Sequence, residues 1–223
     1  MARLGRSWIL SLSLLLGLAP APQLQAALQA TVAAQSEDGP QVLWQGEEAT
    51  VYRLHSGKLE IAKHRGAFDL ALPGLASEPL RIGPRPPAPP AARFSAASKI
   101  LAVSDVHGRF DTLLALLRGQ KVVDGAMRWR FGRGHLVIVG DVMDRGPQVT
   151  EAYWFLRGLE AQARRAGGRV HVLLGNHEAM VLAGDVRYTN PKYLHPREGW
   201  PSVAEQFGPD SEDRKSTRLN SSH

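Results

Sequence analysis

Three short polar segments of the chain combine residue types that can bind metal ions and phosphate. They are SDVHGR at 104–109, GDVMDRG at 140–146 and GNHEAM at 175–180, and each follows a run of aliphatic residues. Aspartate, histidine and asparagine offer oxygen and nitrogen ligands without sulfur, a set that suits Mn, Fe, Zn, Ni or Mg without choosing between them. The segments predict metal-assisted chemistry, since charged side chains at the end of a buried strand are costly unless they have a partner.

The residue types at these positions are compatible with phosphoryl transfer. Asp105 and His107 stand at alternate positions, so in an extended segment both side chains fall on one side and can hold one ion. Asp141, after the next strand, can bridge two ions, and two metals roughly 3.5–4 Å apart clamp the attacking and leaving oxygens. Arg145 adds a forked donor for phosphate oxygens, and a histidine oriented by a carboxylate can protonate the leaving group.

The first segment also has a simpler interpretation. D-x-H alone occurs where an aspartate caps a helix and an unrelated histidine follows. GDVMDRG and GNHE are more specific signals. Because all three segments occur in order, each at the end of a predicted strand, they favour one shared site that also includes Asn176 and His177.

The elements that must position this site alternate between strand and helix. We predict buried strands at Lys99–Ser104, His135–Gly140 and Arg169–Gly175, helices at Phe110–Gly119 and from Val149 to the Gly167-Gly168 pair, and a short edge strand at Met127–Phe131. This alternation predicts an α/β fold with a mostly parallel sheet, whose ligands gather at the carboxyl ends of the strands. Gly140, Gly146 and Gly175 are expected to let the backbone turn sharply there.

The N-terminal half has a different composition. Residues 27–40 are small and polar and are predicted to form a flexible lead-in. Thr50–Leu54 and Lys58–Ala62 alternate around a His-Ser-Gly turn, which predicts a β-hairpin. The hairpin must dock on the domain that follows, because two strands alone are marginally stable in water. Gly83–Ala92 contains five prolines and predicts a stiff, extended linker.

Both ends of the chain carry segments that stand apart from the fold. Arg3 and Arg6 precede a short apolar run from Trp8 to Leu18, the pattern of a secretory signal peptide that ends at Ala26. The run is shorter than the roughly 20 residues of a transmembrane helix. We therefore expect export across the inner membrane to the periplasm, with no stable membrane insertion after cleavage. The last segment, DRKSTRLNSSH, resembles a common sequencing adapter and is interpreted as an artefact.

The composition limits the classes of partner. Of the formal net charge of +6, the first 26 residues contribute +2 and the last eleven contribute +2, which leaves +2 for residues 27–212. So small an excess does not predict a nucleic-acid partner. The 223 residues include no cysteine, which excludes disulfides, thiolate metal sites and a cysteine nucleophile.

The three segments resemble the signatures GDxHG, GDxxDRG and GNHE of the calcineurin-like metallophosphatases, and within them the phosphoprotein phosphatases. The stretch LAGDVRYTNPKY looks most like the bacterial Shewanella-like phosphatases, and the resemblance covers about residues 98–208. It implies an αββα sandwich of two mixed sheets, of which only the first half is present here. It also implies an enzyme that hydrolyses phosphomonoesters, either small ones or phosphotyrosine and phosphoserine/threonine in proteins.

The resemblance implies two divalent metal ions, with Mn, Fe, Zn and Ni as the candidates. Asp105 and His107 would hold the first ion, Asp141 would bridge both, and Asn176 would hold the second. A water molecule activated by the metals would then attack phosphorus directly, without a phosphoenzyme.

The remaining roles are carried over in the same way. Arg145 would bind the substrate phosphate, and His177 would be the general acid, oriented by Asp144. Glu178 would support these residues by hydrogen bonds rather than bind metal.

The chain departs from the family pattern in two places. Ser104 replaces the first glycine of GDxHG, a small change. The family takes two more histidine ligands and another arginine from further downstream, where this chain has ended. His195, followed by proline, is not expected to substitute for them, and His135 and His171 are expected to be packed or edge residues.

These observations predict a chain of five parts. They are a signal peptide at 1–26, an N-terminal segment with the hairpin at 27–82, a proline-rich linker at 83–97, a partial calcineurin-like phosphoesterase domain at 98–212 and the adapter-like tail at 213–223. An apolar sheet face should lie exposed. The 223-residue chain is expected to be poorly stable and weak or inactive, and its full-length parent to be an enzyme.

Two other functions stay open at this point. The nearest is a hydrolase of nucleotides or dinucleotide polyphosphates from the same superfamily, whose motifs are similar. The other is not an enzyme but an inactive half-domain that binds metal or phosphate.

Overall fold

The computed structural model describes residues 37–84, 93–94, 97–194 and 198–206. The predicted signal peptide, the adapter-like tail, most of the predicted linker and His195 lie outside these ranges. Within the described part of the chain, no helix has the length and apolar character needed to cross a membrane.

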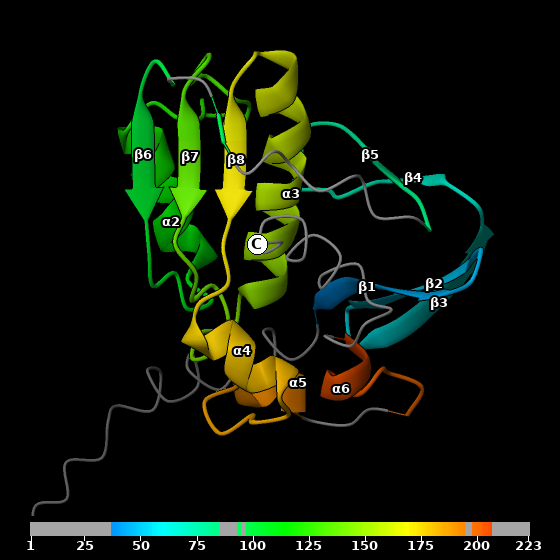
Figure 1. Ribbon diagram of the computed structural model, residues 1–223. Helices are drawn as coiled ribbons and strands as arrows, with labels where there is room; N and C mark the ends of the chain where they lie inside the picture. The colour runs from blue at the N-terminus through cyan, green and yellow to red at the C-terminus, as the bar shows by residue number, and fades with distance from the viewer. Residues whose placement is uncertain (1–36, 85–92, 95–96, 195–197, 207–223) are drawn as a thin grey trace, which may run out of the picture.

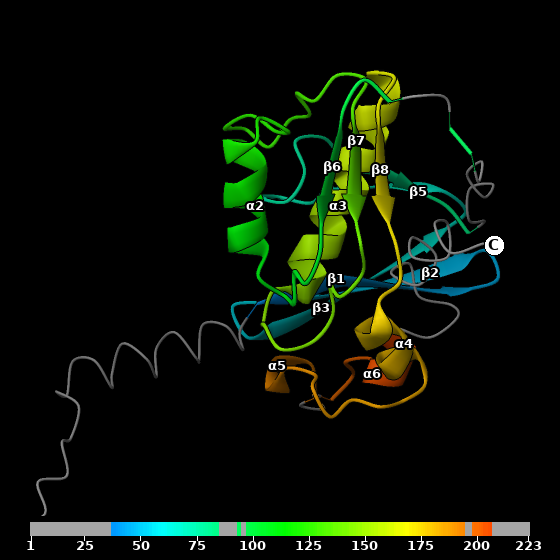
Figure 2. The same ribbon diagram turned by 60° about the vertical axis from the view of Figure 1, so that its left-hand side comes forward.

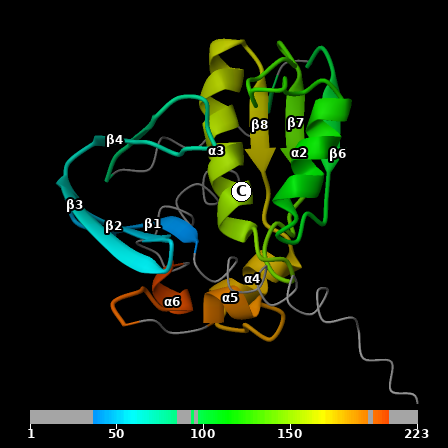
Figure 3. The ribbon, with the colours of Figure 1, turned by 180° about the vertical axis from the view of Figure 1, so that it is seen from behind.

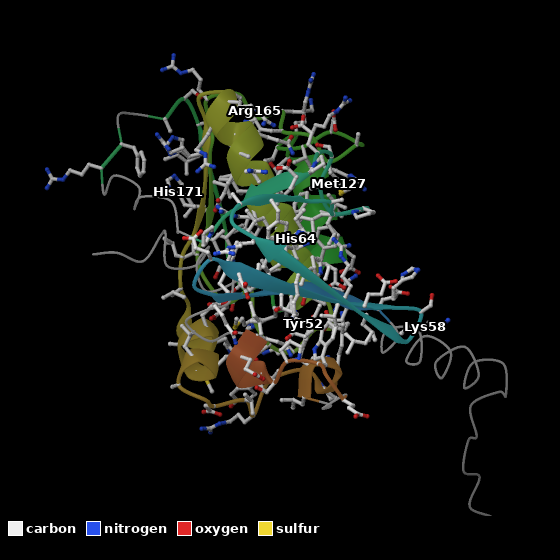
Figure 4. The ribbon with its side chains drawn as sticks, turned by 90° about the vertical axis from the view of Figure 1, so that its right-hand side faces the viewer. Tyr52, Lys58, His64, Met127, Arg165 and His171 are labelled. Atoms are coloured by element: carbon white, nitrogen blue, oxygen red, sulfur yellow. The ribbon has the colours of Figure 1, made fainter. Side chains whose placement is uncertain are left out.

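An antiparallel sheet of three strands forms the N-terminal part. Its strands are β1 (Asp38–Gln45), β2 (Glu48–His55) and β3 (Lys58–Arg65), in the order β1-β2-β3. The predicted hairpin is confirmed, because His55 pairs with Lys58. The two turn residues between them, Ser56 and Gly57, both have positive φ. Figure 4 shows Lys58 at the tip of this hairpin. A second, shorter antiparallel pair follows, β4 (Phe68–Leu70) and β5 (Leu80–Ile82).

The prediction of a flexible lead-in at 27–40 was wrong at its end. Asp38 already pairs with Leu54, and Gln41 onwards pairs with β2 in regular register. The sequence pattern for the start of β1 was weak because Gly39 and Pro40 disfavour a strand. The register between β1 and β2 shifts at these two residues.

The N-terminal sheet docks on a long helix, α3 (Val149–Arg165), as the sequence required. Trp154 belongs to the same hydrophobic cluster as Val42, Trp44 and Val51 of the sheet. Its indole N–H donates to the Pro40 carbonyl oxygen at 2.8 Å, so the polar atom of the buried ring has a partner. Figures 1 and 3 show α3 between the parallel sheet and the N-terminal strands.

The central sheet has three parallel strands, as predicted. They are β6 (Ile100–Val103), β7 (His135–Ile138) and β8 (Arg169–Val172), in the order β6-β7-β8. The helix α2 (Phe110–Gly119) connects β6 towards β7, and α3 connects β7 to β8. Both helices cover one face of the sheet, which Figure 3 shows from the helix side. The predicted extents of the two helices are confirmed, and α3 ends before Gly167, whose φ is +75°.

The two faces of this sheet differ in burial. Leu136 and Ile138 point into the main core, where they meet Leu117 and Phe155 of the helices. On the other face Ile100 is 66% exposed and Val139 is 47% exposed. The predicted exposure of an apolar sheet face is confirmed. The prediction that Lys99–Ser104 forms a buried strand was wrong, because β6 is an edge strand and none of its four residues is fully buried.

The segment Met127–Phe131 is not a strand, although its alternating residues predicted one. Only a single bridge joins Val123 to Trp129, and Met127 has a φ of +59°. Asp124 organises the turn by accepting the N–H groups of Ala126 and Arg128 at 3.0 and 2.9 Å. The pattern arose because Trp129 and Phe131 both enter the core, which loop side chains can do without a ladder.

Three short helices follow β8: α4 (Asn176–Leu182), α5 (Pro191–Leu194) and α6 (Val203–Gln206). Figures 1 and 2 show them beyond the carboxyl ends of the parallel strands. The chain therefore brings its last described segments back to the edge of the sheet where the polar motifs lie.

Candidate active site

The carboxyl ends of β6, β7 and β8 lead into three loops that are hydrogen-bonded to one another. The His107 N–H donates to the Asp141 carbonyl oxygen at 2.8 Å, and the Gly146 N–H donates to the His107 carbonyl oxygen at 3.0 Å. The third loop joins at the Asp141 carboxylate, which accepts the His177 N–H at 3.0 Å. The predicted convergence of three strand ends is confirmed.

The first two loops hold polar residues in an uncommon backbone conformation. Of the eight non-glycine residues with positive φ in the described ranges, five lie here: Asp105 (57°), His107 (44°), Asp141 (54°), Asp144 (70°) and Arg145 (64°). Such conformations cost about 1–3 kcal/mol each and persist only where the surrounding structure holds them. The expectation that Asp105 and His107 share an extended segment was therefore wrong; a left-handed turn brings them together instead.

The glycines of the motifs act in two ways. Gly140 has a φ of +76° and makes the sharp turn that was predicted. At Gly146 and Gly175 the reason is different, since a Cβ would overlap the Gly108 backbone at the first and the Asp141 carboxylate at the second. Close approach of the loops, rather than turning, requires glycine at these two positions.

The His107 imidazole has the features of a metal ligand. Its Nδ1 donates to the Met143 carbonyl oxygen at 2.9 Å, which leaves the lone pair on Nε2. That Nε2 is buried and has no hydrogen-bond partner, and Asp105 Oδ1 lies 3.6 Å from it. Two ligand atoms that each lie about 2.1 Å from one cation are about 3–3.6 Å apart. The residues present therefore fit a divalent ion held by this carboxylate and this imidazole.

A second group of ligand atoms overlaps the first. His107, Asp141 and His177 offer donor atoms that all lie within 4.8 Å of one another. Asn176 is exposed and begins α4, immediately before His177. Its position at the third strand end agrees with the prediction, and its part in binding metal stays a prediction.

His177 and Asp144 form a buried pair. The His177 Nδ1 donates to Asp144 Oδ2 at 2.8 Å, and both side chains are almost inaccessible to solvent. This bond places the proton on Nδ1 and turns Nε2 towards Arg145, whose Nη2 lies 3.5 Å away. The other carboxylate oxygen of Asp144 accepts the Thr189 hydroxyl at 2.8 Å.

The Glu178 carboxylate holds the second loop in shape. The side chain is 1% exposed, and it accepts five hydrogen bonds, from the backbone N–H groups of Asp141, Val142, Met143 and Gly175 and from the Tyr153 hydroxyl. Charge-assisted bonds to converging N–H groups are strong in a buried setting. They offset the backbone strain described above. Glu178 thus supports the loop through hydrogen bonds, as expected.

The comparison with known proteins now decides the family. The sequence profile of the calcineurin-like phosphoesterases matches residues 98–217. The chain belongs to the calcineurin-like phosphoesterase family. Members of this family use divalent metals, and the α/β architecture and the ligand group around His107 agree with that assignment.

Several proteins of known name are similar to this chain. Shewanella-like protein phosphatase 2 of Arabidopsis thaliana is 35% identical over 108 residues, which are 48% of this chain and 28% of that protein. A symmetrical bis(5'-nucleosyl)-tetraphosphatase of Shewanella loihica is 36% identical over 92 residues, 40% of this chain and 28% of that protein.

Solved structures of protein tyrosine phosphatases are also similar to this chain. The cold-active protein tyrosine phosphatase of a psychrophilic Shewanella species is 33% identical, with a TM-score of 0.64 over 82% of this chain and 56% of that one. Another structure of a cold-active protein tyrosine phosphatase gives a TM-score of 0.71 at 34% identity, over 82% of this chain and 55% of that one. The chain thus spans just over half of these structures and under a third of the curated relatives named above.

Within this phosphoesterase domain, the segment after α4 anchors the GDVMDRG loop. The Arg145 N–H donates to the Tyr188 carbonyl oxygen at 2.9 Å, and the Asn190 side-chain amide donates to the Arg145 carbonyl oxygen at 2.7 Å. The backbone of Arg145 is held on both sides, while its side chain is exposed. A guanidinium in this position can approach a phosphate in solution.

Lys192 anchors the same loop from a buried position. Its Nζ donates to the Pro147 carbonyl oxygen at 2.9 Å and lies 3.1 Å from Glu151 and 3.5 Å from Asp38. Burial raises the pKa of the Glu151 carboxyl, and the charge of Lys192 opposes that effect. The neighbouring Tyr193 hydroxyl donates to the Pro147 carbonyl oxygen at 2.8 Å, and burial raises its pKa well above the ordinary value.

Sequence reasoning missed Thr189, Lys192 and Tyr193 as supports of the site. They lie in the stretch RYTNPKY, whose only local signals are a turn before Pro191 and one helical turn after it. Nothing in their spacing points to contacts some 45 residues away. His135 and His171, which were expected to be packed or edge residues, are partly buried in β7 and β8 and lie outside the ligand group.

Proposed function

We propose that this protein is a metal-dependent phosphatase that hydrolyses phosphomonoesters, with phosphorylated proteins as its substrate class. The observation that supports the proposal most directly is the convergence of the Asp105–His107 pair, Asp141 and the Asp144–His177 pair on one edge of the sheet. Relatives named as protein phosphatases and protein tyrosine phosphatases support the substrate class.

Asp105 and His107 would hold one divalent ion, Asp141 would bridge to a second, and Asn176 would complete that second site. Ions held there polarise phosphoryl oxygens and activate the attacking water. That the site holds two ions, and that these are Mn, Fe, Zn or Ni, is part of this proposal.

The side chains of the chain itself perform the remaining tasks. The exposed guanidinium of Arg145 binds and orients the phosphate through forked, charge-assisted hydrogen bonds. His177 serves as the general acid that donates a proton to the leaving oxygen, and the bond between its Nδ1 and Asp144 orients the ring for this task.

The test combines metal exchange with a substrate panel. The full-length parent of this chain, stripped with chelator and then supplied with Mn²⁺, is expected to hydrolyse p-nitrophenyl phosphate and phosphopeptides. Asp105→Asn should lower the bound metal by about one ion per chain and reduce turnover at least about 100-fold. Asp69→Asn, an exposed aspartate of β4, is the matched control and should change neither. Metal-independent turnover, or full activity of Asp105→Asn, would contradict the proposal.

A dinucleotide polyphosphate hydrolase is the second candidate, because relatives named symmetrical bis(5'-nucleosyl)-tetraphosphatase match this chain at an identity similar to that of the protein phosphatases. Diadenosine tetraphosphate in the same panel separates the two. Faster cleavage of this substrate than of any phosphopeptide would favour the second candidate. Metal binding without turnover of any substrate would favour the non-enzymatic half-domain.

Export to the periplasm is a separate proposal that rests on the first 26 residues. The five-part organisation of the chain, including the boundaries at residues 82, 97 and 212, is proposed with it. Mass spectrometry of the N-terminus after expression in a Gram-negative host checks both export and cleavage. An uncleaved cytoplasmic product would contradict them.

A further inference from the structure

An exposed aromatic ring stands beside the proposed general acid. Tyr188 is 49% exposed, and its ring centroid lies 5.4 Å from that of His177, with the two planes tilted by 57°. The ring belongs to neither of the two hydrophobic clusters of the described residues. Large aromatic surface that stays open to solvent next to a reactive group is available to a ligand.

The backbone around Tyr188 fixes the ring relative to the site. Its carbonyl oxygen accepts the Arg145 N–H at 2.9 Å. The next residue, Thr189, donates to Asp144 at 2.8 Å, and Asn190 donates to the Arg145 carbonyl oxygen at 2.7 Å. The ring is thus carried on a segment tied to both the phosphate-binding residue and the residue that orients the acid, so little freedom is lost when a ligand packs on it.

The position of the ring relative to His177 indicates which part of the substrate it meets. His177 protonates the leaving oxygen, so the group attached to that oxygen must lie beside the imidazole. The phosphate itself is held by Arg145 and the metal ligands on the other loops. An aromatic ring next to the acid therefore faces the leaving group rather than the phosphate.

We propose that Tyr188 is a specificity-determining residue that favours aryl phosphate esters, and phosphotyrosine over phosphoserine, by packing against the aromatic leaving group. This inference rests on the proposed phosphatase function. A phenyl ring can stack or pack edge-on against Tyr188, whereas the leaving group of phosphoserine offers one methylene. Aromatic pairs of this kind change affinity by about 3- to 10-fold.

A purely structural role makes a different prediction. If the ring only shields His177 from water, its removal alters turnover of every substrate equally and shifts the pH profile. If the ring binds the leaving group, its removal changes the ratio between aryl and alkyl compounds and leaves the pH profile in place.

Binding of two phosphonates tests the inference independently of turnover. Phenylphosphonate and methylphosphonate share the anionic head and differ in the aromatic group, and neither is hydrolysed. By calorimetry with Mn²⁺-supplied protein, the wild type should bind phenylphosphonate about 3- to 10-fold more tightly than methylphosphonate. Tyr188→Phe should keep this ratio, and Tyr188→Ala should reduce it to below about 2-fold. Phe94→Ala, which removes an exposed ring on the open sheet face, is the control and should keep it.

The outcomes distinguish this inference from the proposed phosphatase function on which it rests. Equal binding of both phosphonates by the wild type, or an unchanged ratio in Tyr188→Ala, overturns the role of Tyr188 and leaves the phosphatase proposal intact. Absence of binding of either phosphonate overturns the phosphate site itself, and the inference with it. Circular dichroism of each variant checks that the fold is retained, and Tyr188→Leu, which also lacks the aromatic ring and should also reduce the ratio, replaces the alanine variant if that one is unfolded. The ratio of kcat/KM between phosphotyrosine and phosphoserine peptides should follow the binding ratio.

Discussion

Thr189 donates a hydrogen bond to Asp144 across 45 residues of sequence, at 2.8 Å. The other carboxylate oxygen of Asp144 accepts the His177 imidazole, so both oxygens of this buried group have a partner. The orientation of the proposed acid is therefore fixed in part by a residue outside all three motifs. A hydroxyl that acts through a carboxylate on an imidazole is the usual arrangement of a positioning residue.

Replacement of Thr189 by valine should loosen this arrangement without a change of side-chain shape. We expect kcat for a phosphomonoester to fall about 10-fold, with KM changed less than about 2-fold, because the variant loses orientation of the acid rather than substrate binding. Thr50→Val, on a strand of the N-terminal sheet, is the control. An equal loss in kcat for both variants, or none for Thr189→Val, would count against the positioning role.

A second prediction concerns Glu178, whose carboxylate accepts five hydrogen bonds around the GDVMDRG loop. Glu178→Gln keeps the volume but replaces an acceptor oxygen by an amide that points its own N–H groups at backbone N–H donors. Unpaired buried donors cost about 1–3 kcal/mol each, so the free energy of unfolding should fall by about 2–4 kcal/mol. Urea denaturation measures the change.

The matched control for that experiment is Glu48→Gln, an exposed glutamate at the start of β2. Its effect should stay within about 0.5 kcal/mol. A Glu178→Gln variant as stable as this control would show that the loop keeps its left-handed residues by other means.

The sequence sufficed for the parts of the fold that local pattern encodes. Helical spacing predicted α2 and α3 almost to the residue, and the aliphatic runs located β6, β7 and β8 and hence the edge where the motifs meet. One wrong prediction shows the limit of local pattern. Met127–Phe131 alternates because two aromatic side chains enter the core from a loop, and that pattern is the same as that of a strand.

The geometry within the site could not be predicted from the sequence pattern either. Period-2 alternation was the only local argument for pairing Asp105 with His107, yet both residues have positive φ. That conformation is stabilised by contacts distant in sequence, such as the bond from the His107 N–H to the Asp141 carbonyl oxygen. Glu178 of α4 in turn accepts the Asp141 N–H. Supports such as Thr189 and Lys192 are visible only once the chain has returned to the edge of the sheet.

A third prediction follows from the burial of Lys192. Its ammonium group lies between Asp38, Glu151 and the Pro147 carbonyl oxygen, so Lys192→Met leaves two carboxylates buried without their cation. Breaking a buried pair in this way costs about 3–5 kcal/mol. The loss should be larger at pH 8 than at pH 5. Burial raises the pKa of Glu151 in the folded protein. A carboxyl with a raised folded pKa contributes to the stability of the folded protein at low pH, and this contribution is lost as the pH rises.

The same measurement on Lys58→Met, at the exposed tip of the hairpin, should show no such dependence on pH. If the Lys192→Met variant loses the same stability at both pH values, the ammonium does not compensate the charge of Glu151.

The fourth prediction concerns the two histidines on the open face of the central sheet. His171 Nε2 lies 3.2 Å from His135 Nδ1, and Phe94 contacts both rings. Burial lowers the pKa of both imidazoles; the charge of Arg169 adds to the effect at each, and His135 adds to it at His171. A histidine with a lowered folded pKa binds fewer protons folded than unfolded, so its contribution to stability is present above about pH 6.5 and is lost as the pH falls.

The wild-type free energy of unfolding should therefore decline between pH 7 and pH 5, and His171→Gln should make this decline shallower. Urea denaturation in the presence of chelator measures it without a contribution from metal release. The exposed His55, beside the hairpin turn, gives the control variant His55→Gln, which should keep the wild-type slope. A slope that is unchanged in His171→Gln would mean that the two rings accept protons on this face without cost, and that the 3.2 Å contact does not couple to folding.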